Sequence, residues 1–130
     1  KSPQFDLINS MLDKIMCNQY ESISELAITS ITDFSKYLNI KTEFKISSKE
    51  KYLKSRNRIE NLINICRKEG ADIYLNLPRG KKIYSKKDFT DRKIQLGFLN
   101  TIESNSIIDL CFNYEKNIIE KKLNDYKIIY

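Results

Sequence analysis

The sequence predicts an α/β fold in which helices cover both faces of a mainly parallel sheet, giving three layers, with a helical segment before it. Three apolar segments with strand patterns, at about residues 40–46, 72–76 and 94–99, alternate with helical patterns. Strands that are joined by crossover helices pair in parallel. The 130 residues are enough for one hydrophobic core, so we expect residues 1–130 to form a single domain.

The first forty residues predict two helices. Residues 4–17 place apolar side chains on one face. Ser22 and Glu25 have the spacing of a capping box, which marks the start of a second helix. That helix should end near Asn39, because asparagine tolerates the left-handed conformation that closes many helices.

Residues 40–76 predict a strand, a helix and a second strand. Apolar and charged residues alternate over 40–46, as in a half-buried strand. Apolar residues at helical spacing follow, and Gly70 stands where a helix ends. Residues 71–76 are almost continuously bulky, which is typical of a strand covered on both faces. The apolar face of the intervening helix consists of Ile59, Leu62, Ile63 and Cys66.

The remaining residues predict a second crossover. Ser85 can cap a short helix that carries Phe89. Ile94, Leu96 and Phe98 alternate as the third strand. Helical patterns over 106–113 and 114–125, with Ile118, Ile119 and Leu123 inward, and a last strand over 127–130 complete the chain.

Composition excludes several classes of protein. No apolar run approaches the ~20 residues of a membrane-spanning helix, so we expect no membrane insertion. The absence of histidine excludes a Ser-His-Asp triad and histidine-ligated zinc within this chain, and we expect no metal or cofactor. Cys17, Cys66 and Cys111 have no paired spacing, so we expect reduced, buried thiols in a cytoplasmic protein.

The formal net charge of +6 favours acidic partners. The aromatic residues do not cluster with the basic ones as a stacking platform for bases would, so nucleic acid is the weakest candidate partner. A nucleotide-linked sugar or another phosphorylated small molecule fits the charge better.

A turn after the second strand is the main candidate for a phosphate site. Pro78 breaks the strand, and Arg79, Gly80, Lys81 and Lys82 follow at once. Ligands of open parallel sheets bind beyond the carboxyl ends of the strands, and glycine lets backbone N–H groups approach an anion. A solvated lysine-rich loop in which Gly80 only makes a turn is the alternative interpretation, and no Walker A or G-x-G-x-x-G spacing decides between them.

Other residues belong to the same hypothesis. Ser47 follows the predicted strand at 40–46, and Arg58 lies near the start of the next helix. Tyr74 and Tyr84 could stack on a ligand ring, or pack in the core.

Ser106 and Asp109 also allow two interpretations. A serine and an aspartate three residues apart can position a substrate hydroxyl or amine. The same spacing caps a helix, because the serine oxygen accepts a backbone N–H and the aspartate favours the positive helix end.

The order of these motifs resembles the C-terminal part of the WbqC-like family. The resemblance rests on Gly70–Tyr74, Gly80-Lys81 with Tyr84, Phe89, Ile94–Phe98 and Ser106–Asp109. Residues 37–42 and the pair Ser47-Ser48 resemble the family's middle segment. By motif match Ser47, Gly80, Tyr84, Ser106 and Asp109 are carried over as site residues.

The resemblance implies a role in bacterial surface-polysaccharide (O-antigen) biosynthesis, as a transferase that adds an amino acid such as glycine to a nucleotide-linked amino sugar. It also implies that this chain is the C-terminal part of a longer protein, with a missing N-terminal segment or a partner polypeptide. The sequence departs from the family pattern at two glycine positions, which are Arg79 and Lys93 here. A non-catalytic α/β module that binds a nucleotide or sugar phosphate, or packs on a partner, is therefore the alternative.

Overall fold

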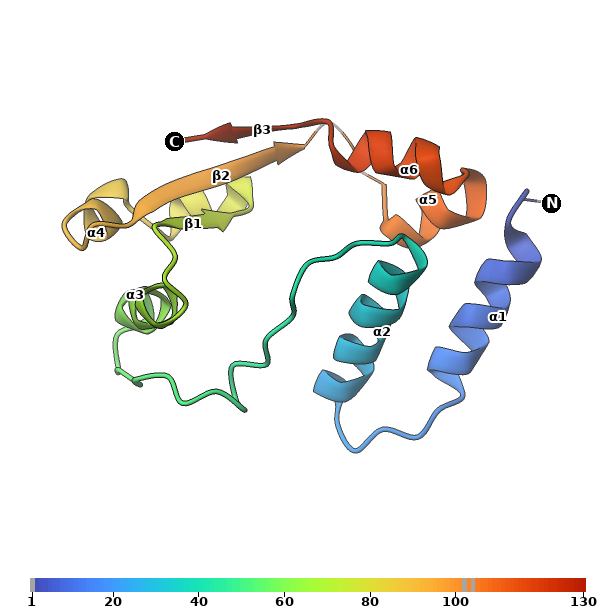
Figure 1. The fold of residues 1–130 in the computed structure, drawn as a ribbon, viewed down its shortest axis with the longest axis horizontal. Coiled ribbons are helices and arrows are strands. Elements are labelled where there is room, and N and C mark those ends of the chain that lie inside the picture. The colour runs from blue at the N-terminus through green and yellow to red at the C-terminus, as the bar shows by residue number, and fades with distance from the viewer. Residues whose placement is uncertain (1, 102, 104) are drawn as a thin grey trace. The chain divides into compact units, whose positions relative to one another are not determined.

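The computed structural model describes residues 2–101, 103 and 105–130 and shows a mixed α/β protein (Figure 1). The α/β class that the sequence predicts is thus confirmed. The described elements, in chain order, are α1 (Phe5–Met16), α2 (Ile23–Tyr37), α3 (Arg58–Lys68), β1 (Ile73–Asn76), the 3₁₀ helix η1 (Pro78–Lys82), α4 (Lys86–Thr90), β2 (Gln95–Thr101), α5 (Ile107–Asn113), α6 (Lys116–Leu123) and β3 (Tyr126–Ile129).

These elements form two compact units, each with its own core. The helical unit comprises Lys1–Phe44 and Glu103–Asp125, and the α/β unit comprises Lys45–Ile102 and Tyr126–Tyr130. Two separate cores arise because the apolar stripes of α1, α2, α5 and α6 pack on one another, while α3 and α4 pack on the sheet.

The helical unit is built around one apolar cluster. Its buried members come from four helices, and the amphipathic patterns of α1 and α2 supply the first three. The predicted helices at 4–17, 106–113 and 114–125 are confirmed within a few residues, although Ile118 and Leu123 are more exposed than expected. The buried residues are Ile8, Ile15, Phe34, Leu110, Cys111 and Ile119.

The ends of α2 follow from its sequence. The Ser22 hydroxyl oxygen accepts the Glu25 backbone N–H at 3.3 Å, and the Glu25 carboxylate accepts the Glu21 N–H at 3.0 Å. At the other end Asn39 has φ 56°, and the Ile40 N–H donates to the Ser35 carbonyl at 2.9 Å. This is a Schellman cap, with asparagine in the left-handed position.

The α/β unit contains a three-stranded mixed sheet in the order β1-β2-β3. β1 and β2 are parallel, with Tyr74 opposite Leu96 and Asn76 opposite Phe98, which confirms the predicted pairing of the second and third apolar segments. β3 is antiparallel to β2. Leu96 and Phe98 pack with Ile63, Cys66 and Phe89 in the second core, so α3 and α4 cover one face of the sheet.

The prediction of a strand at residues 40–46 is wrong. This segment has no regular structure, and Ile40 and Phe44 are exposed. Alternation shows that a segment could present one apolar face, but a strand also needs a hydrogen-bonded neighbour. Here the segment leads from the helical unit into the α/β unit and pairs with no strand of the described chain.

The three-layer parallel sheet is consequently not confirmed. The sheet has one parallel and one antiparallel pair. Ile73 and Leu75, which point to the face opposite the α3–α4 core, remain partly exposed. The nearly continuous bulky residues at 71–76 therefore led to a prediction of more burial than β1 has.

The three cysteines are free thiols, as predicted. Cys66 and Cys111 lie in the two cores, but Cys17 is exposed, so the prediction of burial is wrong for this residue. It follows the last turn of α1 and lies outside the helix's buried stripe. Within the described residues no helix has both the length and the apolar character to cross a bilayer.

Candidate functional site

The best candidate site in the α/β unit is a pocket of about 240 Å³ beside the carboxyl end of β1. It is lined by Lys81, Tyr84, Lys86, Phe98, Ile129 and Tyr130. Lys81 comes from η1, Tyr84 from the turn after it, and Lys86 from the first turn of α4. We call these six residues the aromatic–basic pocket.

Sheet register brings the pocket together. Phe98 lies opposite Asn76 on β1 and opposite Ile129 on β3. The Phe98 ring is buried, and the Lys81 ammonium lies 5.5 Å from the ring centroid. The pocket therefore combines apolar ring surface with two lysines.

Gly97 shapes the sheet next to this pocket. A Cβ at Gly97 would lie 2.7 Å from Leu75 Cδ2, 2.9 Å from Ile128 Cγ2 and 3.2 Å from Tyr130 Cε1. The missing side chain lets the Tyr130 ring approach the central strand. A glycine in the middle of a strand is a sign of such an approach, although only the structure shows that Tyr130 makes it.

Gly80 makes the turn of η1 and packs it on the sheet. Its φ is not positive, and its N–H donates to the Leu77 carbonyl at 2.9 Å. Its carbonyl accepts the N–H groups of Ile83 and Tyr84, each at 2.9 Å. A Cβ there would lie 2.9 Å from Asn76 Nδ2 and 3.3 Å from Phe98 Cε1, so glycine lets η1 pack closely on the sheet.

Tyr74 belongs to an aromatic cluster that supports the pocket wall. Its ring stacks on Phe89 with centroids 5.4 Å apart and an interplanar angle of 7°. Tyr84 meets both rings edge-on, at 6.1 Å from Tyr74 and 5.9 Å from Phe89. Burial, followed by the nearby Tyr84, raises the pKa of Tyr74, so its hydroxyl stays protonated near neutral pH. The cluster fixes the orientation of Tyr84.

The remaining predicted residues of this unit lie elsewhere. Arg79 and Lys82 project from η1 and are exposed, and Arg58 is the exposed first residue of α3. Ser47 lines a different pocket, of about 360 Å³. Its other lining residues are Ser48, Tyr52, Leu53, Lys54, Ser55, Asn61 and Ile65. Of the residues predicted to bind phosphate, Lys81 and Tyr84 therefore share one pocket, and Lys86, Phe98, Ile129 and Tyr130 were missed.

Ser106 and Asp109 belong to the helical unit, at the start of α5. The Ser106 hydroxyl oxygen accepts the Ile108 N–H at 3.2 Å, which makes Ser106 the N-cap. One Asp109 carboxylate oxygen accepts from the Asn113 side-chain amide at 3.2 Å. Both side chains thus make local helical contacts.

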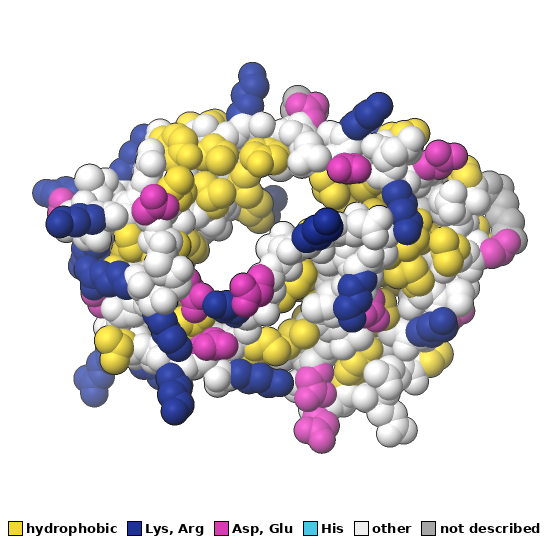
Figure 2. Space-filling model, viewed as in Figure 1, with side chains coloured by type: hydrophobic (Ala, Val, Ile, Leu, Met, Phe, Trp, Pro, Cys, Tyr) yellow, Lys and Arg dark blue, Asp and Glu magenta, His cyan; other side chains and the backbone are white. Residues whose placement is uncertain are grey.

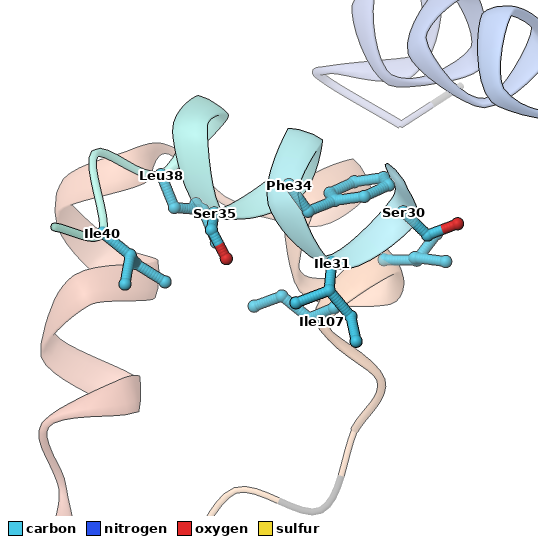
Figure 3. A pocket seen from close by; sticks show the side chains of 8 residues that line it. Ser30, Ile31, Phe34, Ser35, Leu38, Ile40 and Ile107 are labelled. Carbon is cyan, nitrogen blue, oxygen red and sulfur yellow. The ribbon is translucent and has the colours of Figure 1, made fainter. Parts of the chain in front are cut away.

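The helical unit also has an apolar pocket of about 220 Å³ (Figure 3). Ile31 and Phe34 of α2, with Leu38 and Ile40 just after it, line the pocket together with Ile107 and Ile108 of α5. The two serines that complete the lining are Ser30, whose hydroxyl donates to the Leu26 carbonyl at 2.8 Å, and Ser35. This pocket can enclose an apolar group, and none of its described lining residues carries a charge.

Basic and acidic side chains are interspersed on the face that Figure 2 draws. Within the described chain no group of three or more histidine, cysteine or carboxylate side chains is arranged to hold a metal ion. Five basic residues lie close together in the sequence at η1 and α4, namely Arg79, Lys81, Lys82, Lys86 and Lys87.

Comparison with known proteins decides the family. The WbqC-like protein family matches residues 1–121. The chain belongs to the WbqC-like family. No curated protein and no solved structure matches it significantly. Among the residues carried over from the resemblance, Tyr84 lines the aromatic–basic pocket, and Gly80 lies against the ring of Phe98, which also lines it.

Proposed function

We propose that this protein acts in bacterial surface-polysaccharide biosynthesis and holds a nucleotide-linked sugar in the aromatic–basic pocket. Membership of the WbqC-like family supports the pathway class. The main support for the ligand class is that one pocket combines two lysines with three aromatic rings. The lysines are Lys81 and Lys86, and the rings are those of Tyr84, Phe98 and Tyr130. Aromatic faces pack on the C–H face of a sugar or on a base, and lysines bind phosphate.

The size of the pocket limits what it encloses. Small-molecule pockets commonly measure about 300–1,000 Å³, and this one measures about 240 Å³. It suits one ring of the ligand. The phosphates would lie at the rim, where Lys81 and Lys86 are exposed.

Calorimetric titration with a panel of nucleotide sugars tests this proposal. Lys81→Glu with Lys86→Glu should weaken binding at least tenfold, which is about 1.4 kcal/mol, because both phosphate contacts become repulsive. Lys82→Glu with Lys87→Glu is the matched control, since it makes the same change in net charge outside the pocket lining. The affinity of this control for the nucleotide sugar should stay within about threefold of wild type. Any such small loss would come from weaker long-range electrostatic attraction, which salt screens.

If both double variants weakened nucleotide-sugar binding equally, the binding would reflect net charge and not contacts in the pocket. No binding of any nucleotide sugar by the wild-type protein would remove the proposed ligand.

The finer proposal is transfer of an amino acid such as glycine to an amino sugar, in which the sugar amine attacks the carbonyl of an activated amino acid and the activating group leaves. Ser106 and Asp109 are the candidates for orienting the amine, and they are proposed on the helical unit alone, separately from the aromatic–basic pocket. Ser106→Ala separates the two interpretations of this serine. A loss of about 1 kcal/mol in the free energy of unfolding, with nucleotide-sugar affinity and product formation unchanged, identifies a helix cap only. Loss of product with Asp109→Asn, at wild-type affinity for the nucleotide sugar, would support the catalytic role.

A binding module without catalysis is the second candidate, and one observation favours it. None of the described residues that line the aromatic–basic pocket has a carboxylate or thiol side chain, so among these side chains a lysine or a tyrosine would have to transfer any proton. Mass-spectrometric product analysis distinguishes the two: binding with no modified sugar, in the presence of amino acid and ATP, indicates the module.

A further inference from the structure

A buried hydroxyl stands in the wall of the apolar pocket of the helical unit. It belongs to Ser35 of α2, which is 9% exposed and is, among the described residues, the sole polar residue in the buried class. Buried hydroxyls in proteins normally have a hydrogen-bond partner. Two neighbours on α2 have one, since the Ser30 hydroxyl donates to the Leu26 carbonyl at 2.8 Å and the Thr32 hydroxyl to the Ile28 carbonyl at 2.9 Å.

The Ser35 hydroxyl has no such partner. Its Oγ forms no hydrogen bond with any residue that the structure describes. Its oxygen also remains accessible, unlike the Tyr20 hydroxyl, which is enclosed without a partner. Figure 3 shows the Ser35 oxygen pointing into the space between Ile40 and Ile107, whereas the Ser30 oxygen points away. The Ser35 hydroxyl therefore faces the pocket, where it can donate or accept a hydrogen bond.

The other walls limit the kind of ligand that fits. Aliphatic side chains and the Phe34 ring form them, and none of the described lining residues carries a charge. An ionised group would lose its hydration here without a counter-charge, so the pocket favours an uncharged ligand. A dry apolar cavity of about 150 Å³ holds a benzene molecule. This pocket measures about 220 Å³, so a chain of roughly six non-hydrogen atoms has room.

We propose that this pocket binds a short aliphatic chain that carries one uncharged oxygen, as an alcohol or as the carbonyl of an acyl group. The chain displaces water from Phe34 and the surrounding isoleucines, and Ser35 forms a hydrogen bond with the oxygen. The free hydroxyl argues for an oxygen-bearing ligand, because a pure hydrocarbon or an apolar side chain of another protein would leave it unpaired. The proposal does not rest on the nucleotide-sugar site, which lies in the α/β unit.

NMR titration of the whole chain with three small probes tests the proposal. Isoamyl alcohol, isovaleramide and isovalerate share one branched carbon skeleton and differ in the polar group. The two neutral probes should shift backbone amide signals of α2 and α5 in a saturable way, and the tighter one distinguishes an alcohol from an acyl ligand. Isovalerate should bind at least tenfold more weakly, because its carboxylate finds no counter-charge among the lining residues.

Matched substitutions on α2 make the test specific. Ser35→Ala should weaken binding of the tighter probe about threefold to tenfold, the effect of one neutral hydrogen bond. Ser24→Ala is the same change outside the lining and should have no effect. Ile31→Gln should weaken binding about threefold or more, because it removes apolar contact from the pocket. Ile23→Gln, at a site that is 84% exposed and outside the lining, should keep wild-type affinity.

The stability of the ligand-free protein supplies a second measurement. Replacing an unpartnered buried hydroxyl with an apolar group is close to neutral or stabilising, so Ser35→Ala should be at least as stable as wild type in urea. A less stable Ser35→Ala variant would show that the hydroxyl has a structural partner, and would overturn the proposal.

Four other results would also overturn it. They are no saturable shift with either neutral probe, equal binding of isovalerate, wild-type affinity of Ser35→Ala, or self-association that Ile31→Gln abolishes, which would assign the pocket to a second copy of the chain. Nucleotide-sugar affinity should not change with Ser35→Ala, so either proposal can fail without the other.

Discussion

Three residues at helix ends have a left-handed backbone conformation. The free-energy cost of this conformation depends on the side chain, and it is smallest for glycine. The φ angles are 56° for Asn39, 66° for Gly70 and 61° for Lys93. Lys93 closes a Schellman cap after α4, since its N–H donates to the Thr90 carbonyl at 2.9 Å and the Ile94 N–H to the Phe89 carbonyl at 3.1 Å. The left-handed backbone at Lys93 is one that glycine adopts without the steric cost that a lysine side chain incurs.

We expect Lys93→Gly to raise the free energy of unfolding by about 0.5–1 kcal/mol. The left-handed conformation costs a non-glycine residue about 1–2 kcal/mol, and the flexibility of glycine in the unfolded chain offsets part of that gain. Urea unfolding measures the difference.

Gly70→Ala is the matched opposite change. A Cβ there would meet no atom within 4 Å, so the expected loss of about 1 kcal/mol reflects backbone conformation alone. A less stable Lys93→Gly variant would show that the lysine side chain contributes more than its backbone strain costs.

At the scale of elements, an irregular segment is held to α3 by charged contacts. Tyr52 donates to Glu69 Oε1 at 2.8 Å, and Lys45 bonds to the other oxygen of the same carboxylate. Lys68 lies 4.7 Å from the Tyr52 ring centroid. The hydrogen bond from Lys45, then that from Tyr52, lowers the pKa of Glu69. Residues 45–52 therefore depend on an ionised Glu69 for their attachment to the helix.

The sign of the pH dependence follows from this shift. The pKa of Glu69 is lower in the folded state than its unfolded value of about 4.3, so the contacts stabilise the fold above that value and the gain is lost as pH falls through the folded pKa. Glu69→Gln should thus be less stable than wild type at pH 7, with the difference shrinking towards pH 3. Unfolding at several pH values checks this.

A Glu69→Gln and Tyr52→Phe double-mutant cycle supplies the control. The two changes should be non-additive at pH 7, because they remove the same hydrogen bond. A pH-independent difference between wild type and Glu69→Gln would contradict the proposed role of the charge.

At the scale of the whole molecule, the reactivity of the three thiols indicates whether each core is closed, because Cys66 and Cys111 are buried in different cores. Burial raises the pKa of the Cys111 thiol to about 11 and also raises that of Cys66. Cys17 is exposed. Because the thiolate is the reactive form, the folded protein at pH 8 should show one fast-reacting thiol with Ellman's reagent.

The denatured, unreduced protein should show three reactive thiols. Cys17→Ser is the control and should leave no fast-reacting thiol in the folded state. Fast reaction of two or more thiols in the wild-type protein would mean that one of the cores opens readily.

Local chemistry predicted much of this structure. Ser22, Asn39, Ser85 and Ser106 were expected at helix ends and lie there, because caps depend on a few neighbouring backbone groups. The sequence also predicted the apolar face of α3 and the alternation in β2, since periodicity indicates which face an element buries. The residues concerned are Ile59, Leu62, Ile63 and Cys66 in α3, and Ile94, Leu96 and Phe98 at β2. The parallel pairing of β1 with β2 followed from the crossover between them.

Only the tertiary structure decided the rest. The alternation at 40–46 could not reveal that no strand pairs with it, because pairing depends on residues distant in the sequence. The aromatic–basic pocket joins residues 81–86 to Phe98 and Tyr130 through the register of three strands. The sequence by itself determined the caps, the core faces and the cationic turn, whereas long-range register determined which of those cations share a pocket with aromatic rings and which face outward.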